Sequence, residues 1–275
     1  MTAVCGVCPH ACELEEGRTG FCGARTNRNG AVVCENYGRV TSLALDPIEK
    51  KPLRRFHPGG RILSVGSYGC NLRCPFCQNY EISMAGREGA ETTVISPEAL
   101  AARAAELKSR GNIGLAFTYN EPLIAPEYVR DCAALNRKNG LVNVVVTNGY
   151  VNEKPLLELL PLIDAMNIDL KGFTEAFYRR LGGGLEPVRR TIETAARRCH
   201  VEVTTLIVPG ENDSPGEMDR LSAWLSGIDP DLALHVTRFF PRYRMTDRGP
   251  TPVETVYALA AVARRHLRWV FEGNC

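Results

Sequence analysis

From residue 61 onward, two apolar patterns alternate along the chain. Short runs of apolar and β-branched residues predict six strands, and amphipathic stretches between them predict helices. The strands are expected at 61–67, 112–118, 141–147, 165–170, 201–208 and 232–239, with a further short one at 267–271. The helices are expected at 97–109, 126–138, 154–160, 174–180, 187–198, 215–226 and 252–265.

This alternation predicts an α/β domain with a parallel sheet and right-handed crossovers. Such a series either closes partly into a barrel or lies flat as a doubly wound sheet, and periodicity alone leaves both open. In either arrangement the chemistry is expected at the carboxyl ends of the strands. Polar residues do gather at these positions: Cys70 follows the first strand, and the later ones end near Asn120, Glu121, Asn148, Asp169, Lys171, Pro209 and Gly210.

The first sixty residues lack these periods and are rich in glycine and charge. Four cysteines lie within eighteen residues, which is typical of a loop wrapped on a metal, and His10 could replace one ligand. A loop of free thiols is the alternative. These cysteines are Cys5, Cys8, Cys12 and Cys22.

Two β-like runs follow the cysteines, at 31–38 and 39–45, and are expected to pair as a hairpin. We therefore predict a small Cys-rich extension over residues 1–60, followed by a core domain over residues 61–275.

Length and composition change this picture little. With 275 residues, 44% of them hydrophobic, the chain can bury a full core without disulfides. A net charge of +2 argues against nucleic acid or a membrane surface and favours a small molecule or a protein as partner. Neither a long apolar run nor a secretory signal is visible, so we expect a cytoplasmic protein. In that compartment eleven cysteines indicate metal ligands and core residues rather than disulfides.

Three cysteines behind the first strand carry the strongest chemical signal. Cys70, Cys74 and Cys77 are separated by three residues and then by two, so their thiolates can converge on one soft metal centre. A closed structural zinc site uses four protein ligands, whereas three ligands leave one coordination position open. The spacing therefore indicates a reactive centre.

Cys70-x3-Cys74-x2-Cys77, with aromatic Phe76 before the last cysteine, resembles the radical S-adenosylmethionine (radical SAM) superfamily. Longer stretches resemble the radical SAM proteins of the AmmeMemoRadiSam system, which are similar to activating enzymes of the pyruvate formate-lyase type. The resemblance covers nearly the whole chain. The stretches are DPIEKKPL, SYGCNLRCPFCQNYEIS, FTYNEPLI, VVVTNGY, MNIDLK, VTTLIVPGENDS and RFFPRYRMTDRGPTPVET.

The resemblance implies a partial (β/α)6 TIM-like barrel and two cofactors. A 4Fe-4S cluster on Cys70, Cys74 and Cys77 would bind SAM at its fourth iron, and reduction would cleave SAM to a 5'-deoxyadenosyl radical. The adenine would lie near Phe76 and along the turn that contains Pro209 and Gly210. The remaining contacts to SAM would come from Asn120 and Glu121 to its ammonium group, from Asp169 and Lys171 to its ribose or carboxylate, and from Asn148.

Simpler explanations exist for some of these residues. Asp169 and Lys171 could form a surface salt bridge, Asn120 could cap a turn, and Phe76 could be core packing. Val146 stands where formate-lyase activating enzymes carry an aspartate of a cation site, so we do not expect that site here. Nor does the spacing decide whether the N-terminal cysteines hold zinc or a second cluster.

The expected partners are SAM, an electron donor such as flavodoxin or ferredoxin, and a small-molecule or protein substrate that the sequence does not identify. A glycyl residue of a partner protein is one candidate substrate. A zinc-binding scaffold without catalysis is the alternative from a different functional class.

Overall fold

The computed structural model describes residues 1–275, and an eight-stranded sheet forms its centre. Seven strands are parallel and stand beside one another in chain order, while the first, β6, is antiparallel to its neighbour. Because the order never reverses, the sheet has no switch point between two halves. Right-handed crossovers then place the helices on one face, which gives a partial barrel rather than a doubly wound sheet. The strands are β6 (Ser42–Pro47), β7 (Arg61–Gly66), β9 (Asn112–Phe117), β10 (Val142–Thr147), β11 (Ala165–Asp169), β12 (His200–Ile207), β13 (Ala233–Arg238) and β14 (Trp269–Gly273).

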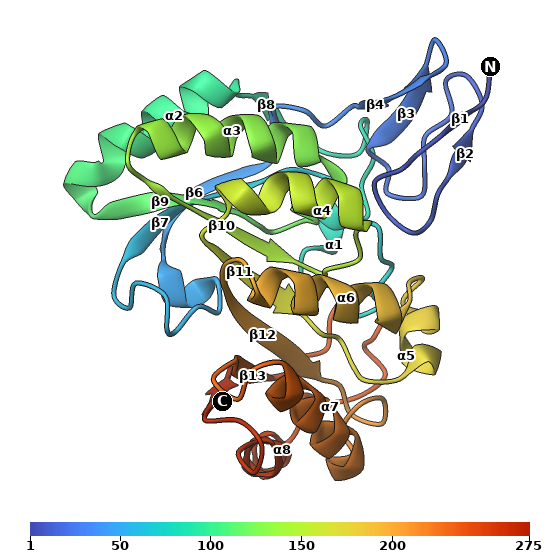
Figure 1. The fold of residues 1–275 in the computed structure, drawn as a ribbon. Helices are drawn as coiled ribbons and strands as arrows, with labels where there is room; N and C mark the ends of the chain where they lie inside the picture. The colour runs from blue at the N-terminus through green and yellow to red at the C-terminus, as the bar shows by residue number, and fades with distance from the viewer.

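All seven predicted helices are present, with boundaries that differ by at most three residues. In Figure 1, α3, α4 and α6 cover the same face of the sheet. The helices that start at Pro97 and Pro215 each have a proline in the first turn and a serine N-cap. The side chains of Ser96 and Ser214 accept the backbone N–H groups of Ala99 and Glu217. None of the helices is long and apolar enough to cross a bilayer. Their bounds are α2 (Pro97–Glu106), α3 (Pro126–Lys138), α4 (Glu153–Leu159), α5 (Glu175–Arg180), α6 (Leu185–Ala196), α7 (Pro215–Ile228) and α8 (Val253–Ala263), and a short additional helix is α1 (Tyr80–Ser83).

The N-terminal region forms two small two-stranded sheets at one side of the barrel, and a third pairs residues 39–40 with residues 93–94 (Figure 1). The predicted pairing of 31–38 with 39–45 is wrong, since β4 pairs with β3. Asn29 and Gly30 join these two strands at φ values of 55° and 79°, which suit a two-residue hairpin turn. The Asn-Gly pair lies before residue 31, so a prediction based only on the apolar runs at 31–38 and 39–45 overlooks it. The small strands are β1 (Ala3–Val4), β2 (Glu13–Leu14), β3 (Arg25–Arg28), β4 (Ala31–Cys34), β5 (Arg39–Val40) and β8 (Thr93–Val94).

Part of the predicted extension belongs to the main sheet. Strand β6, from residues 42–47, pairs with β7 along its full length. The division at residue 60 stays a prediction, but the barrel recruits its edge strand from before that point.

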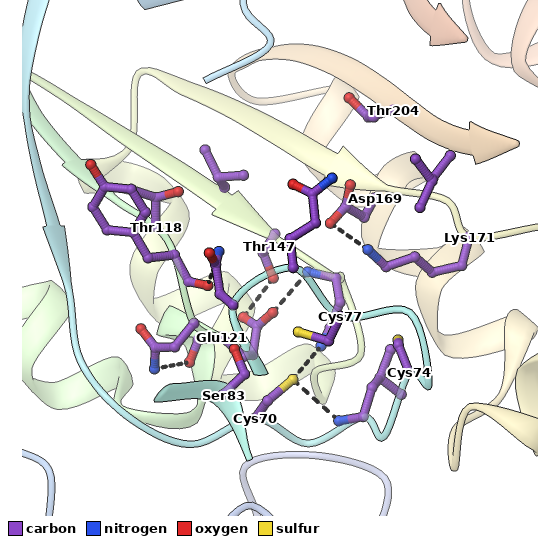
Figure 2. A pocket seen from close by; sticks show the side chains of 18 of the residues that line it. Cys70, Cys74, Cys77, Ser83, Thr118, Glu121, Thr147, Asp169, Lys171 and Thr204 are labelled. Atoms are coloured by element: carbon purple, nitrogen blue, oxygen red, sulfur yellow. Dashed lines mark hydrogen bonds and ion pairs between the residues drawn. The ribbon is translucent and has the colours of Figure 1, made fainter. Parts of the chain in front are cut away.

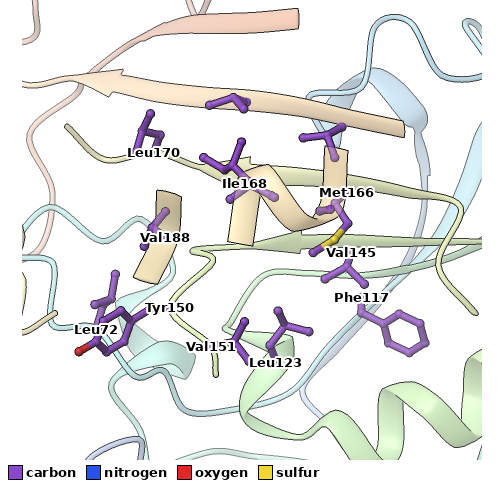
Figure 3. Packing of buried hydrophobic residues seen from close by; sticks show 14 of the residues in the cluster. Leu72, Phe117, Leu123, Val145, Tyr150, Val151, Met166, Ile168, Leu170 and Val188 are labelled. Atoms are coloured by element: carbon purple, nitrogen blue, oxygen red, sulfur yellow. The ribbon is translucent and has the colours of Figure 1, made fainter. Parts of the chain in front are cut away.

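Two hydrophobic clusters lie on opposite faces of the sheet. The larger one packs the helices against the strands, and Figure 3 shows Val145, Met166 and Ile168 within it. Val144 belongs instead to the smaller cluster, together with Leu53 from the loop between β6 and β7. Neighbouring strand residues point to opposite faces, so the loop of residues 48–60 fills the inside of the barrel.

Candidate active site

A cavity of about 280 Å³ opens at the carboxyl ends of the parallel strands (Figure 2). It contains all three cysteines of the loop after β7, as well as side chains from the ends of β9, β10 and β11. The structure therefore brings together most of the residues that the sequence places at this edge. The predicted residues that line it are Cys70, Cys74, Cys77, Phe76, Asn120, Glu121, Asn148, Asp169 and Lys171.

The segment 69–78, here called the cysteine loop, is held where it leaves β7. The Asn120 side chain accepts the N–H of Ser67 at 3.0 Å and donates to the carbonyls of Tyr68 and Gly69 at 3.1 Å. Gly69 has a φ of 89°, and a Cβ atom there would lie 2.5 Å from the carbonyl oxygen of Cys22. Only glycine fits this close approach without strain.

The Cys70 sulfur has two nearby donors, one from the cysteine loop and one from the loop after β10. Cys70 Sγ accepts the N–H of Leu72 at 3.4 Å and the Asn148 side-chain amide at 3.6 Å. Burial raises the pKa of Cys70 well above its ordinary value and the pKa of Cys74 to about 11, so both remain neutral thiols unless a metal cation binds them. Three sulfur donors from one loop, with N–H groups directed at one of them, have the chemistry of an iron-sulfur ligand set.

No group of three or more histidine, cysteine or acidic side chains has the arrangement of a metal-ion ligand shell in the structure.

Glu121 is a buried carboxylate that joins the ends of two strands. One oxygen accepts the N–H of Leu123 at 2.9 Å and the hydroxyl of Thr147 at 2.7 Å, and the other accepts the N–H of Asn148 at 2.7 Å. Burial raises the pKa of Glu121 to about 7, although these hydrogen bonds oppose the rise. Its oxygens are thus fixed in place beside the cavity.

Asp169 and Lys171 form an ion pair of 2.7 Å on the opposite side of the cavity (Figure 2). Burial alone would lower the pKa of Lys171, but the adjacent Asp169 carboxylate raises it above its ordinary value. The Lys171 backbone is fixed as well, because its N–H donates to the Tyr178 hydroxyl and its carbonyl accepts from Asn212. The pair is a fixed positive and negative charge at the cavity wall.

Of the residues predicted to contact the adenine, one lines the cavity and two do not. Phe76 is buried, lines the cavity and stacks almost parallel to Phe177, with ring centroids 6.3 Å apart. Pro209 and Gly210 do not line the cavity. The Pro209 carbonyl instead accepts a hydrogen bond of 2.8 Å from Arg248.

Several cavity residues were not singled out in the sequence. Thr204 and Leu206 stand two apart on β12 and so share the face that Thr237 presents on β13. Alternate residues of a strand share a face, so counting every second residue back from the ends of β12 and β13 identifies these three as candidates for the cavity wall.

Tyr119 lies in the FTYNEPLI stretch but was assigned no role from the sequence, and its backbone is unusual. It lines the cavity at a φ of 73°, which is rare for a bulky residue. Its hydroxyl donates to Asp46 at 2.7 Å, and Lys51 pairs with the same carboxylate at 2.9 Å while lying 4.6 Å from the Tyr119 ring centroid. These contacts connect the DPIEKKPL stretch to the cavity.

The four N-terminal cysteines meet at a separate place. Together with His10 they surround a small cavity of about 10 Å³. Burial raises the pKa of Cys8 to about 11 and also raises that of Cys22. The structure thus brings together the cysteines that the sequence grouped, at Cys5, Cys8, Cys12 and Cys22.

Comparison with known proteins identifies relatives of this chain. An uncharacterized protein of Methanocaldococcus jannaschii is 39% identical over 274 residues, which cover 98% of this chain and 80% of that protein. Pyruvate formate-lyase 1-activating enzyme of Escherichia coli K12 is 29% identical over 172 residues, which cover 60% of this chain and 68% of that enzyme. The fold resembles Streptococcus suis SuiB bound to S-adenosylmethionine, with a TM-score of 0.59 at 12% identity, over 78% of this chain and 52% of that one.

The family model of the radical SAM superfamily matches residues 64–222, which is more than half of the chain. The matched region begins in β7 and includes the cysteine loop, Glu121 and the Asp169–Lys171 pair. Enzymes of this family generally use a 4Fe-4S cluster and SAM. The chain therefore belongs to the radical SAM superfamily and is an enzyme of that class.

Proposed function

We propose that this enzyme cleaves SAM reductively at a 4Fe-4S cluster held by Cys70, Cys74 and Cys77, and that the resulting 5'-deoxyadenosyl radical abstracts hydrogen from a substrate. One observation carries the proposal: the three cysteines share a single cavity with a buried carboxylate and a fixed ion pair. When bound, the cluster supplies one electron and SAM supplies the radical group.

The residues around the cysteines have separate roles in this proposal. Glu121 accepts hydrogen bonds from the SAM ammonium group, while Lys171 attracts the SAM carboxylate and Asp169 the ribose hydroxyls. Phe76 offers a flat apolar face to the adenine. The N–H groups of Leu72 and Asn148 stabilise negative charge on the Cys70 sulfur. Enclosure by the barrel keeps water from the reacting atoms.

For the substrate, the most specific candidate is a glycyl residue of a partner protein. The E. coli relative is named as an activating enzyme of pyruvate formate-lyase, and a Thauera aromatica relative as one of benzylsuccinate synthase. A small-molecule substrate is the second candidate. In either case we expect flavodoxin or ferredoxin to donate the electron. Electron paramagnetic resonance of candidate partner proteins after incubation with enzyme, SAM and reductant would show a glycyl radical only if the first candidate is correct.

The N-terminal cysteines form a second metal site in this proposal. Cys5, Cys8, Cys12 and Cys22 offer four thiolates, the number that closed structural sites use. The protein would then carry a reactive centre with three cysteine ligands and a closed centre with four.

SAM cleavage tests the proposed function directly. Anaerobically reconstituted enzyme is incubated with SAM and dithionite, and 5'-deoxyadenosine is measured by mass spectrometry. Wild type should form it, and Cys74→Ala should not. Cys132→Ala, a buried cysteine of α3 outside the cavity, serves as the control and should remain active. Stoichiometric zinc without iron in the wild-type protein would instead support a zinc-binding scaffold.

A further inference from the structure

We infer that metal loading of the N-terminal cysteine site holds the cysteine loop in shape, so that this site must be filled before the 4Fe-4S cluster can be assembled. The inference rests on the proposed second metal site and adds to it a function: the site acts as a support for the catalytic loop. The contacts between the two cysteine groups carry the argument.

The N-terminal segment contacts the cysteine loop directly and along its backbone. The N–H of Cys70 donates to the carbonyl of Cys22 at 3.2 Å, so a residue of one cysteine group holds a residue of the other. Gly69 packs against the same carbonyl so closely that no Cβ atom fits. A shift of Cys22 would therefore move the start of the loop.

Side chains add further contacts on the same side. The His10 ring donates a hydrogen bond of 2.9 Å from Nε2 to the carbonyl of Asn71. The guanidinium of Arg73 donates to the carbonyl of Phe21 and lies 4.3 Å from the Phe21 ring centroid. Both His10 and Phe21 stand next to the four cysteines around the small cavity.

The N-terminal segment also holds the loop after β10, which carries Asn148. The N–H of Asn152 donates to the carbonyl of Val7 at 3.0 Å, and its side chain donates to the carbonyl of Gly6 at 2.8 Å. Asn71 of the cysteine loop in turn donates to the carbonyl of Tyr150 at 2.6 Å. Two walls of the catalytic cavity therefore share one support.

This support has little apolar core of its own to stabilise it. Strands β1 and β2 have two residues each. The hydrophobic cluster around Cys22 has four buried members, Cys22, Ala24, Tyr68 and Ile124, with the partly buried Ala85 and Ala90 packed against it. Segments with so small a core commonly depend on a metal for their folding energy. The cavity between the cysteines, at about 10 Å³, is about the size of one water-sized sphere, which suits a single ion such as Zn²⁺ rather than a cubane cluster. Ligation requires the thiol side chains to turn toward that common centre.

The test separates the two sites. In a variant with Cys70, Cys74 and Cys77 all replaced by alanine, only the N-terminal site can bind zinc. Hydrogen exchange of residues 69–78 is compared before and after zinc, and again with Cys12→Ser added. Zinc should bind at one ion per chain and slow the exchange about tenfold, and Cys12→Ser should abolish both effects. Cys34→Ser is the matched control, because Cys34 lies outside the four and its partner Asn36 can also accept from serine.

In the chain with the three loop cysteines intact, Cys12→Ser should reduce the iron and sulfide retained after reconstitution, while Cys34→Ser should retain the wild-type amounts. Zinc binding without a change in exchange would overturn the inference while leaving the second metal site intact. No zinc binding would overturn the inference. If wild-type protein with both metal sites filled fails to cleave SAM, the proposed function is refuted. The inference is not, because SAM cleavage does not measure hydrogen exchange in the cysteine loop.

Discussion

Replacing Glu202 by glutamine should destabilise the barrel from the inside. The Glu202 side chain has no solvent exposure, and its two oxygens accept four hydrogen bonds. Two come from the backbone N–H groups of Arg54 and Arg55 at 3.0 and 2.8 Å, and two from the rings of His200 and His235 at 2.9 and 2.6 Å. The carboxylate thus fastens the loop inside the barrel to strands β12 and β13.

The magnitude follows from the acidity of this group. Burial alone would raise the pKa of Glu202, but the hydrogen bonds from His200, His235 and the two backbone N–H groups lower it from 4.5 to about 2. A difference of that size corresponds to about 3 kcal/mol of folding free energy. Because the folded-state pKa is the lower one, this stabilisation is present above pH 4.5 and is lost as the pH falls toward 2. Glutamine removes the negative charge, and its side-chain NH2 group, which can only donate, faces one of the four hydrogen-bond donors that the carboxylate accepts from.

Urea unfolding measures the effect. At pH 7 we expect Glu202→Gln to lower the free energy of unfolding by about 3 kcal/mol, and at pH 4 the difference from wild type should shrink by about 1 kcal/mol. The control is Glu272→Gln on β14, where a more exposed ion pair with Arg264 should contribute less than about 1 kcal/mol. A loss at Glu202 no larger than at Glu272, or one independent of pH, would refute the reasoning.

Three further changes test the site. Gly69→Ala should prevent cluster assembly and leave the N-terminal metal bound, because its Cβ would meet the Cys22 carbonyl at 2.5 Å; equal loss of both metals in metal analysis would contradict this. Lys171→Met should weaken SAM binding about tenfold at unchanged iron content, measured by equilibrium dialysis, and unaltered affinity would exclude the ion pair from SAM binding. Tyr119→Phe should cost about 1 to 2 kcal/mol in urea unfolding by removing a hydrogen bond to Asp46, and an unchanged midpoint would argue against that bond.

The strand and helix pattern was predictable because the barrel repeats one physical unit. Buried parallel strands read as apolar runs and the helices carry caps, so their order and approximate ends follow from the sequence. The family resemblance predicted the partial barrel, but periodicity alone left the closure of the sheet open, because strand neighbours depend on contacts between distant residues. The pairing of β6 with β7 is such a contact. The hydrophobic pattern also paired 31–38 with 39–45 wrongly, because it overlooked the Asn29-Gly30 turn that joins β3 to β4.

The site shows the same division. Cys70, Glu121 and Lys171 were predictable because strand ends and cysteine spacing place them on one edge. Tyr119 was not, since a positive φ and a bond to Asp46 are tertiary features. The family resemblance implied that Pro209 lies near the adenine, yet Pro209 does not line the cavity and its carbonyl accepts a hydrogen bond from Arg248. Proximity to an edge places a residue near the site without deciding which way it faces.

The first sixty residues support the site from two directions. On one side the cysteine-rich segment holds the cysteine loop through the carbonyl of Cys22. On the other side the loop of residues 48–60 fills the barrel, where Asn167 donates to the carbonyl of Pro52, a residue that lines the cavity. Glu202 holds this loop by accepting the backbone N–H groups of Arg54 and Arg55. Because the two supports contact different parts of the cavity, damage to the N-terminal cysteines should disturb the cluster first, and damage to Glu202 should disturb global stability first.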